Sequence, residues 1–156
     1  MEPIISFRGT AFSNFAAVPG GVTLEDPGGP PVLDLDTLAP VRYPTVEHAY
    51  QAAKTLDQKA RERIRLLPTA GKAKAAGKRL KIRPDWEAIK VDVMRGLLRQ
   101  KFRPDTFLAR VLLETGEREL IEVNTWGDRF WGECPRGVGE NQLGKLLMEI
   151  RGELRG

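Results

Sequence analysis

Residues 43–54 read Tyr-Pro-Thr-Val-Glu-His-Ala-Tyr-Gln-Ala-Ala-Lys, and this stretch predicts how the chain around it is organised. Pro44 biases the residue before it towards an extended backbone. Thr45 is a good N-cap, because its hydroxyl can accept a hydrogen bond from one of the first unpaired amides of a helix. From Val46 onward the apolar residues recur at helical spacing, which is the pattern of one buried face. The stretch therefore predicts an extended segment that becomes a helix at Thr45.

Two charged residues stand on this expected helix. Glu47 falls in the first turn, where the helix dipole and the unpaired N–H groups favour a negative charge. Lys54 lies two turns later on the same side. An ordinary surface helix with charges that complement its dipole explains this pattern, and a functional carboxylate is the alternative. His48 follows Glu47 and points away from it, which favours a packed or solvent-facing imidazole.

Length and composition limit the class of protein. The chain has 156 residues, of which 41% are hydrophobic and 29% charged, as expected for one globular domain with a sizeable core. No apolar run is as long as a membrane span, and the N-terminus does not read as a secretory signal. The single cysteine, Cys134, suits a reducing compartment, so we expect a cytoplasmic protein without a membrane partner. One histidine and one cysteine cannot form a conventional zinc site. A Mg²⁺ or Ca²⁺ site made of carboxylates alone stays open, but no clustered Asp/Asn loop suggests one, and we predict neither a metal nor a cofactor.

Positive charge is concentrated in the middle of the chain. The net charge is +4, but residues 54–110 carry 17 Lys and Arg against 6 Asp and Glu, so the flanking segments are acidic. Such an asymmetry favours a polyanionic partner, either the phosphates of a nucleotide or those of a nucleic acid. A solvated helical surface explains the same pattern, and both interpretations stay open.

The order of expected elements predicts an α+β, mainly α fold, a single compact domain of five or six helices with a few short strands over residues 1–156. A proline- and glycine-rich insertion or loop is expected at about 16–40, with a loop by composition at 19–31, and residues 19–40 as a whole resemble a hairpin or a flexible insertion. The expected strands are 3–7, 32–36 and 119–123, and the loop 124–139 is rich in aromatic residues and glycine. The expected helices begin with the opening stretch and continue at 57–67, 70–80, 85–102, 106–113 and 143–154. The helix at 85–102 has a broad apolar stripe, with Ile89, Val93, Leu97 and Lys101 on one side, which is typical of a central core helix.

Four polar and aromatic clusters are candidates for a site. They are Arg8 with Ser13, Asn14 and Phe15; Glu47 with Lys54; Asp85 with Trp86; and the segment from Asn124 to Trp131 that leads to Gly139–Asn141. Rings in a loop either fill a core or stack on a ligand. Glycines just before a helix can let backbone amides approach a phosphate, although Gln142 replaces the third glycine of a dinucleotide fingerprint.

These clusters recur in order in one known family. The matching segments are Phe7-Arg8-Gly9 with Ser13-Asn14-Phe15, the whole of 43–54, Arg83-Pro84-Asp85-Trp86, Asp128-Arg129-Phe130-Trp131-Gly132, and residues 139–151. On these residues the chain resembles the NADAR family, the small N-glycosidase domains related to bacterial swarming-motility-associated proteins. Residues 16–40 depart from the family pattern, and Trp126-Gly127-Asp128 doubles its single Trp-Gly.

The resemblance implies hydrolysis of a bond between ribose C1′ and nitrogen through a cationic, oxocarbenium-like state. It implies Glu47 as the carboxylate that stabilises the cation or orients water. A helix start favours the ionised form, which argues against Glu47 as general acid, so Asp128 or Asn14 would assist the leaving group. The implied ligand-binding residues are Arg8, Asn14, Phe15, Lys54, Trp86, Trp131, Gly139 and Asn141.

The resemblance leaves three functions open. The first is removal of ADP-ribose from guanine in nucleic acid, with a guanine-modifying ADP-ribosyltransferase toxin as the linked partner and a role as its antitoxin or in DNA repair. The second is hydrolysis of phosphorylated ribosylamino-pyrimidine intermediates of riboflavin synthesis. The third is a non-catalytic module that binds ADP-ribose or nucleic acid, against which the presence of Glu47 counts.

Overall fold

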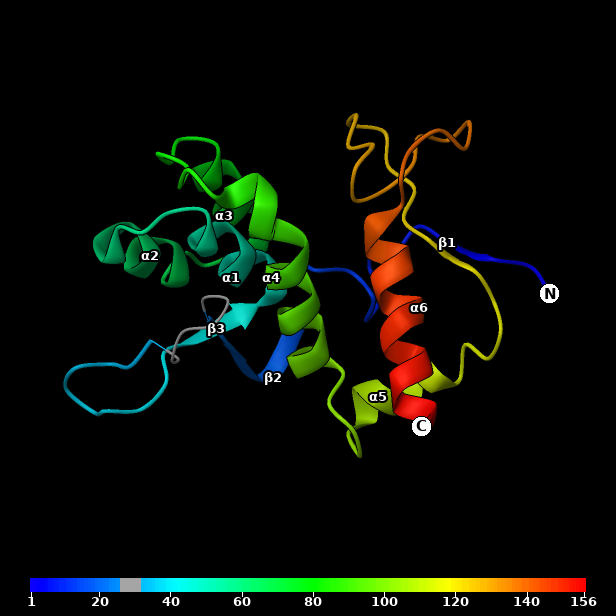
Figure 1. Cartoon of the computed structure of the whole chain (residues 1–156), viewed down its shortest axis with the longest axis horizontal. Helices are drawn as coiled ribbons and strands as arrows, with labels where there is room; N and C mark the ends of the chain where they lie inside the picture. The colour runs from blue at the N-terminus through cyan, green and yellow to red at the C-terminus, as the bar shows by residue number, and fades with distance from the viewer. Residues whose placement is uncertain (26–31) are drawn as a thin grey trace. The chain divides into compact units, whose positions relative to one another are not determined.

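The computed structural model describes residues 1–25 and 32–156, and Figure 1 shows short strands among more extensive helices. This confirms the α+β, mainly α class. The strands are β1 Ile4–Ile5, β2 Ala17–Thr23, β3 Arg42–Thr45 and β4 Leu120–Ile121. The helices are α1 Val46–Ala53, α2 Gln58–Arg65, α3 Ala70–Gly77, α4 Trp86–Lys101, α5 Phe107–Leu113 and α6 Gln142–Arg155.

Contacts group the described residues into two compact units. One is continuous, Asn14–Lys101, and the other joins both ends of the chain, Met1–Ser13 with Phe102–Gly156. The expectation of one domain over the whole chain stays a prediction. No helix in the part of the chain that the structure describes is long and apolar enough to cross a membrane.

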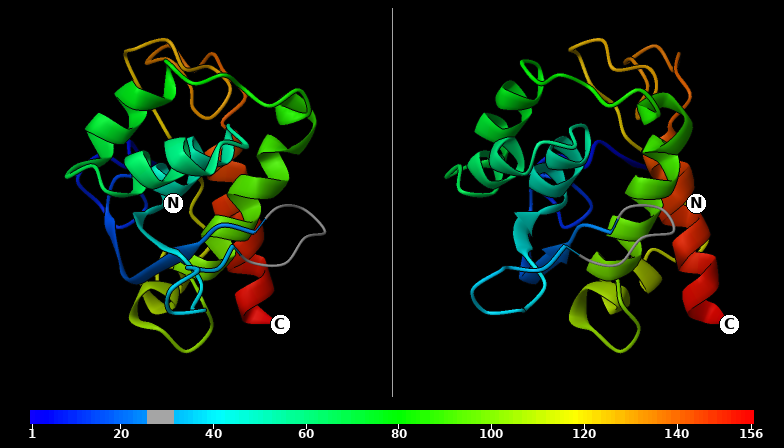
Figure 2. Two further views of the ribbon diagram at one scale, coloured as in Figure 1. Left: turned by 90° about the vertical axis from the view of Figure 1, so that its left-hand side faces the viewer. Right: turned by 60° about the vertical axis from the view of Figure 1, so that its left-hand side comes forward.

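In the continuous unit, β2 and β3 pair antiparallel and lead into α1. Val22 pairs with Tyr43, and the register shifts between Ala17 and Val22. Figure 2 shows β3 running directly into α1, which begins at the expected cap: the Thr45 hydroxyl accepts the His48 N–H at 3.0 Å. The extended-then-helical prediction for the opening stretch is therefore confirmed.

The loop expected from composition at 19–31 is wrong for its first part. Residues 19–23 belong to β2, where Gly20 and Gly21 take positive φ values of 78° and 72° inside the irregular pairing. A Cβ on Gly21 would lie 2.8 Å from the Tyr43 carbonyl oxygen. The glycines here allow a bulge and a close backbone approach rather than a loop. Residues 26–31 of that expected loop lie outside the described residues.

The strand expected at 32–36 is also wrong. Only Leu33 forms a bridge, to Pro40, and the residues between them make a turn. The Asp34 carboxylate organises this turn by accepting the backbone N–H groups of Asp36 and Thr37, each at 2.9 Å. Asp is well suited to such a turn because its short side chain can mimic a backbone acceptor. The alternating leucines and aspartates read as a strand, but the local side-chain bonds favour the turn.

Helices α1 and α3 pack through small side chains. The buried residues of α3 are Ala70, Ala73 and Gly77, which recur at helical spacing, and all of α1 is buried. Alanine and glycine let two helix axes approach closely, so side chains of α1 can rest on the backbone of α3. Helix α4 also packs on α1 and buries the apolar face that its spacing predicted, including Val93, Leu97 and Lys101.

In the other unit, β1 and β4 form a parallel pair, with Ile4 opposite Leu120 and Ile5 opposite Ile121. These are shorter than the strands expected at 3–7 and 119–123. Helix α6 packs on α5 and β4 along its apolar face. Residues 124–139 form the expected loop, with isolated bridges at Val123, Glu133 and Gly139.

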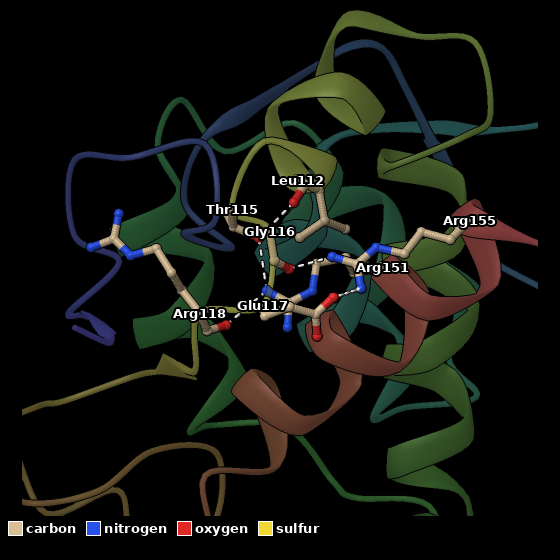
Figure 3. A network of polar contacts seen from close by, with 7 residues as sticks. All are labelled: Leu112, Thr115, Gly116, Glu117, Arg118, Arg151 and Arg155. Atoms are coloured by element: carbon tan, nitrogen blue, oxygen red, sulfur yellow. Dashed lines mark hydrogen bonds and ion pairs between the residues drawn. The ribbon is translucent and has the colours of Figure 1, made fainter. Parts of the chain in front are cut away.

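Two arginines of α6 hold the segment between α5 and β4 (Figure 3). Arg151 is buried and donates to the Thr115 hydroxyl at 2.8 Å and to the Arg118 carbonyl at 2.7 Å. One turn later, Arg155 pairs with Glu117 at 2.6 Å. Burial lowers the pKa of the Arg151 guanidinium. Arg151 thus ties the start of this bend at Thr115 to its continuation at Arg118.

Candidate functional site

Glu47 lies at the buried start of α1. Glu47 is only 8% exposed, and its backbone N–H donates to the Asn14 carbonyl at 3.1 Å. The carboxylate oxygen Oε1 accepts a hydrogen bond from Gln51 Nε2 at 2.8 Å. Three features therefore fix this carboxylate: a capped helix start, the Asn14 segment and a side chain one turn later.

Asn14 and Phe15 extend this neighbourhood. Asn14 Nδ2 makes only a long contact to Met94 Sδ at 3.7 Å. Its Oδ1 is buried and has no hydrogen-bond partner in residues 1–25 and 32–156. Phe15 is 46% exposed, and Lys74 Nζ lies 5.9 Å from its ring centroid. Among the described residues, Asn14 thus supplies a buried acceptor without a protein donor. Phe15, the next residue, supplies an exposed ring beside the Asn14 backbone that contacts Glu47.

Lys54 and Trp86 meet through Tyr50. Lys54 Nζ lies 5.5 Å from the Tyr50 ring centroid, and the Tyr50 and Trp86 rings are 5.1 Å apart and tilted by 58°. Trp86 is buried, so its position favours packing over the expected stacking on a base. The bond from Arg83 lowers the pKa of Asp85 and holds the start of α4. The ammonium of Lys54 is the part of this cluster that suits an anionic ligand.

Asp128 organises the loop of the other unit. Its Oδ1 accepts the backbone N–H groups of Phe130 at 3.1 Å and Trp131 at 2.9 Å. Asn124 and Asp128 exchange two further bonds, from Asn124 Nδ2 to the Asp128 carbonyl and from the Asp128 N–H to Asn124 Oδ1. The observed contacts give Asp128 a role in holding the turn, and its assignment as a catalytic residue stays a prediction.

The tryptophans of this loop differ in exposure. Trp131 is half-buried and packs edge-on against Phe130, with ring centroids 4.9 Å apart. Trp126 is 57% exposed. Trp131, the predicted ligand residue, is therefore held in place by its neighbour, whereas most of Trp126 faces solvent.

Gly139 and Asn141 have structural roles that the phosphate-binding interpretation did not foresee. The N–H groups of Glu140, Gln142 and Leu143 donate to backbone carbonyls of the 129–131 segment, at 2.7 to 3.0 Å. The Asn141 N–H also donates within the chain, to the Gly132 carbonyl at 3.3 Å, and the assignment of the amides at Gly139–Asn141 to a phosphate stays a prediction.

Asn141 is likewise occupied by the fold. Its Oδ1 accepts the Glu122 N–H at 3.0 Å, and its Nδ2 donates to the Leu120 carbonyl at 2.9 Å, so the side chain joins β4 to the start of α6. A Cβ on Gly139 would lie 2.3 Å from the Gly132 carbonyl oxygen. Close packing of the loop explains this glycine, and its assignment to ligand binding stays a prediction.

His48 is the packed imidazole that the sequence favoured, whereas Glu122 and Gln51 were not anticipated from the sequence. His48 is buried, with Nδ1 2.7 Å from the Thr45 hydroxyl and Nε2 3.0 Å from the Leu67 carbonyl. Because a carbonyl only accepts, Nε2 donates to Leu67, and both ring nitrogens are occupied by contacts within the chain. Burial raises the pKa of Glu122, and Asp128 raises it further, against the bond that Glu122 accepts from the Phe7 N–H. Gln51 completes the set through its bond to Glu47.

The structure therefore places the predicted residues as two groups, one in each unit. The continuous unit holds Asn14, Phe15, Glu47, Lys54 and Trp86; the other holds Asp128, Trp131, Gly139 and Asn141, with Arg8 exposed in a turn near the N-terminus. No cluster of three or more His, Cys, Asp or Glu residues suited to a metal occurs in the described ranges.

Comparison with known proteins finds a matching family, similar sequences and a similar solved structure. Residues 8–155 match the family described as the NADAR domain. The chain is 39% identical over 160 residues to N-glycosidase YbiA of Escherichia coli strain K12, which covers 98% of this chain and 89% of the relative. It is also similar to the NMR structure of E. coli YbiA, with a TM-score of 0.74 and 36% identity over 99% of this chain and 87% of that one. A Zea mays protein named riboflavin biosynthesis protein PYRR, chloroplastic, is 35% identical over 98% of this chain, which spans 25% of that protein.

Proposed function

The chain belongs to the NADAR domain family, whose relatives include N-glycosidases, and from this premise we propose that it hydrolyses the bond between ribose C1″ of ADP-ribose and a guanine nitrogen in nucleic acid. Breaking such a bond leaves positive charge on the ribose. A fixed carboxylate stabilises that charge or orients the attacking water. The single observation that carries the proposal is the Glu47 carboxylate, buried at a capped helix start and held by Gln51.

The choice of a nucleic acid over a small substrate rests on charge. Residues 70–84 contain no acidic residue, and four cations are exposed there, Lys72 on α3 and Lys78, Arg79 and Lys81 after its last residue, Gly77. We call these four residues the α3 basic face, although only Lys72 belongs to the helix itself. Lys74 of the same helix contacts the Phe15 ring, and Phe15 follows Asn14, which bonds to Glu47. These Lys and Arg side chains thus belong to the same unit as the Glu47 carboxylate. A phosphodiester strand bound at Glu47 would require such a series of cations.

The experiment compares one adduct in two settings. Wild-type protein and Glu47→Gln are incubated with ADP-ribosylated guanine in a short single-stranded DNA and as the free nucleotide, and released ADP-ribose is quantified. We expect release by the wild type, and a fall of roughly 10²–10⁴-fold in kcat for Glu47→Gln with the melting temperature preserved. If ADP-ribose is released from neither the DNA adduct nor the free nucleotide adduct, the proposed substrate is wrong.

A charge variant separates the two settings. Lys72→Gln/Lys78→Gln/Lys81→Gln should lower kcat/KM on the DNA adduct by roughly tenfold or more and weaken its salt dependence, because fewer counterions are released. The same variant should leave turnover of the free nucleotide adduct unchanged. Equal effects on both adducts would contradict a role for the α3 basic face in holding a strand.

The second candidate function is hydrolysis of phosphorylated ribosylamino-pyrimidines. The relative named for riboflavin biosynthesis favours it, since that protein matches 98% of this chain. Turnover of the free pyrimidine intermediate that exceeds turnover of the guanine adduct, and that is insensitive to the triple lysine variant, would select this function. Binding of ADP-ribose without hydrolysis of any of these substrates would instead indicate a binding module. A role in DNA repair or as an antitoxin, with a guanine-modifying ADP-ribosyltransferase toxin as its partner, follows only from the first function.

A further inference from the structure

Gln51 lies one helical turn after Glu47 and is 4% exposed. Its Nε2 donates to Glu47 Oε1 at 2.8 Å. A primary amide is a neutral donor, so it can fix one carboxylate oxygen without neutralising the negative charge. That property distinguishes it from a lysine or arginine at the same position, which would form an ion pair and compete with a developing cation.

The other end of the Gln51 amide is unusual. Its Oε1 is buried and accepts no hydrogen bond from the residues that the structure describes. A buried acceptor without a donor is unfavourable and is rare in folded proteins. Rotating the amide by half a turn would not help, because Oε1 would then face the Glu47 carboxylate oxygen.

Gly77 of α3 provides the surface on which this amide rests. A Cβ at position 77 would lie 1.8 Å from Gln51 Oε1 and 2.6 Å from its Cδ. Gly77 stands within a helix and its φ is not in the left-handed region, so its backbone conformation does not require glycine. Glycine is also a poor helix former. Space for the Gln51 amide is the feature of this position that does require it.

These observations share one explanation. We propose that Gln51, held against Gly77, is a positioning residue that fixes the orientation of the Glu47 carboxylate for the reaction. The inference rests on the role of Glu47 in the proposed function. Both features, an acceptor without a donor and a glycine at the last residue of α3 that no left-handed φ requires, follow from the need to aim Nε2 at Glu47. The small face of α3 brings Gly77 close enough to do this.

The variants separate the donor, its support and a matched control. Gln51→Met keeps the length of the side chain but removes the donor. Gly77→Ala keeps the donor and displaces it. Gly71→Ala is the control, because a Cβ at this other α3 glycine meets only Thr69 Oγ1, at 4.0 Å. We expect kcat to fall about 10- to 100-fold in Gln51→Met and Gly77→Ala with KM within about twofold, since small misplacements of a catalytic group reduce turnover. Gly71→Ala should retain wild-type kcat.

A double variant tests whether Gly77 acts through Gln51. In a Gln51→Ala background the shortened side chain leaves room for a methyl group at position 77. Gly77→Ala should then cause no further loss of kcat, because coupled residues do not contribute additively. Additive losses, wild-type kcat in Gln51→Met, or equal losses in Gly71→Ala and Gly77→Ala would each overturn the proposal.

A second readout does not depend on the substrate. The side-chain amide signals of Gln51 in 15N–1H NMR spectra, assigned by their absence from Gln51→Met, should move in Glu47→Ala and Gly77→Ala and stay in place in Gly71→Ala. If these signals respond as expected while no adduct is hydrolysed, the proposed function fails and the contact stands. If they are unchanged in Gly77→Ala in a folded protein, the positioning role fails whatever the activity.

Discussion

Lys101 is a lysine on an apolar helical face. It occupies the last turn of α4, is 2% exposed, and shares the buried side of the helix with Leu97. Burial lowers its pKa to about 8, from an ordinary value of 10.5. The four-residue spacing from Ile89 through Leu97 to Lys101 already placed this ammonium on the core side in the sequence. A charge in that position opposes folding until it is neutralised.

The resulting pH dependence has a definite sign. Below about pH 8 the lysine is charged in both states, and the full cost of its burial is present. Between about pH 8 and 10.5 the unfolded chain binds more protons, so the free energy of unfolding rises with pH through this residue. At about 1.4 kcal/mol per pKa unit, the rise approaches about 3 kcal/mol.

The rise is measured by urea unfolding of the wild type and of Lys101→Met from pH 7 to 10.5. Subtracting the free energy of unfolding of the variant from that of the wild type removes the contribution of the other titrating groups. The wild type should gain stability relative to the variant across that window. Parallel stability curves would contradict the assignment of the rise to Lys101.

At the same scale, Glu47 could be predicted and Gln51 could not. The cap and the dipole mark Glu47 from local sequence alone. The proposed role of Gln51 depends on its contact with Gly77, which lies on another helix. A local sequence pattern cannot predict a contact between two helices. The structural role of Asn141 could not be predicted for the same reason, since its two bonds reach back to the carbonyl of Leu120 and the amide of Glu122.

Among the elements, helices were predicted better than strands. Capping residues and apolar spacing predicted α1, α3 and α4 because both signals are local. The segment 19–23 was misread because proline and glycine usually mark loops, whereas here they form an irregular strand whose pairing partner lies beyond residue 40. Its pairing depends on tertiary contacts, which composition does not encode.

The bond network of α6 supports a prediction about that helix. Arg151→Met removes the donor to the buried Thr115 hydroxyl and to the part-buried Arg118 carbonyl. We expect a loss of about 2–3 kcal/mol in the free energy of unfolding, as for hydrogen bonds from a charged group. Urea denaturation measures it.

Arg155→Met is the matched control one turn away. Its ion pair with Glu117 is exposed, so its loss should be below about 1 kcal/mol. Equal losses in the two variants would show that burial of Arg151 does not matter.

At the scale of the whole molecule, the parallel pair of β1 and β4 has a consequence for the order of folding. The segment Met1–Ser13 belongs to a unit whose remainder begins at Phe102, whereas Asn14–Lys101 is continuous. Closing a long loop costs more chain entropy than closing a short one, and contacts distant in sequence form slowly. During synthesis, β1 leaves the ribosome first but has no partner until Leu120 follows.

We therefore expect the first strand to be among the last elements to become protected. In pulsed hydrogen-exchange refolding, amides of α1, α3 and α4 should gain protection before the amides of Ser6 and Ile4, which donate to Ile121 and Glu119. Simultaneous protection of all of them would contradict this order. If this order holds, β1 is an exposed strand without its pairing partner for much of the protein's synthesis. During that period, the strand edge of another molecule could pair with β1 before β4 is synthesised.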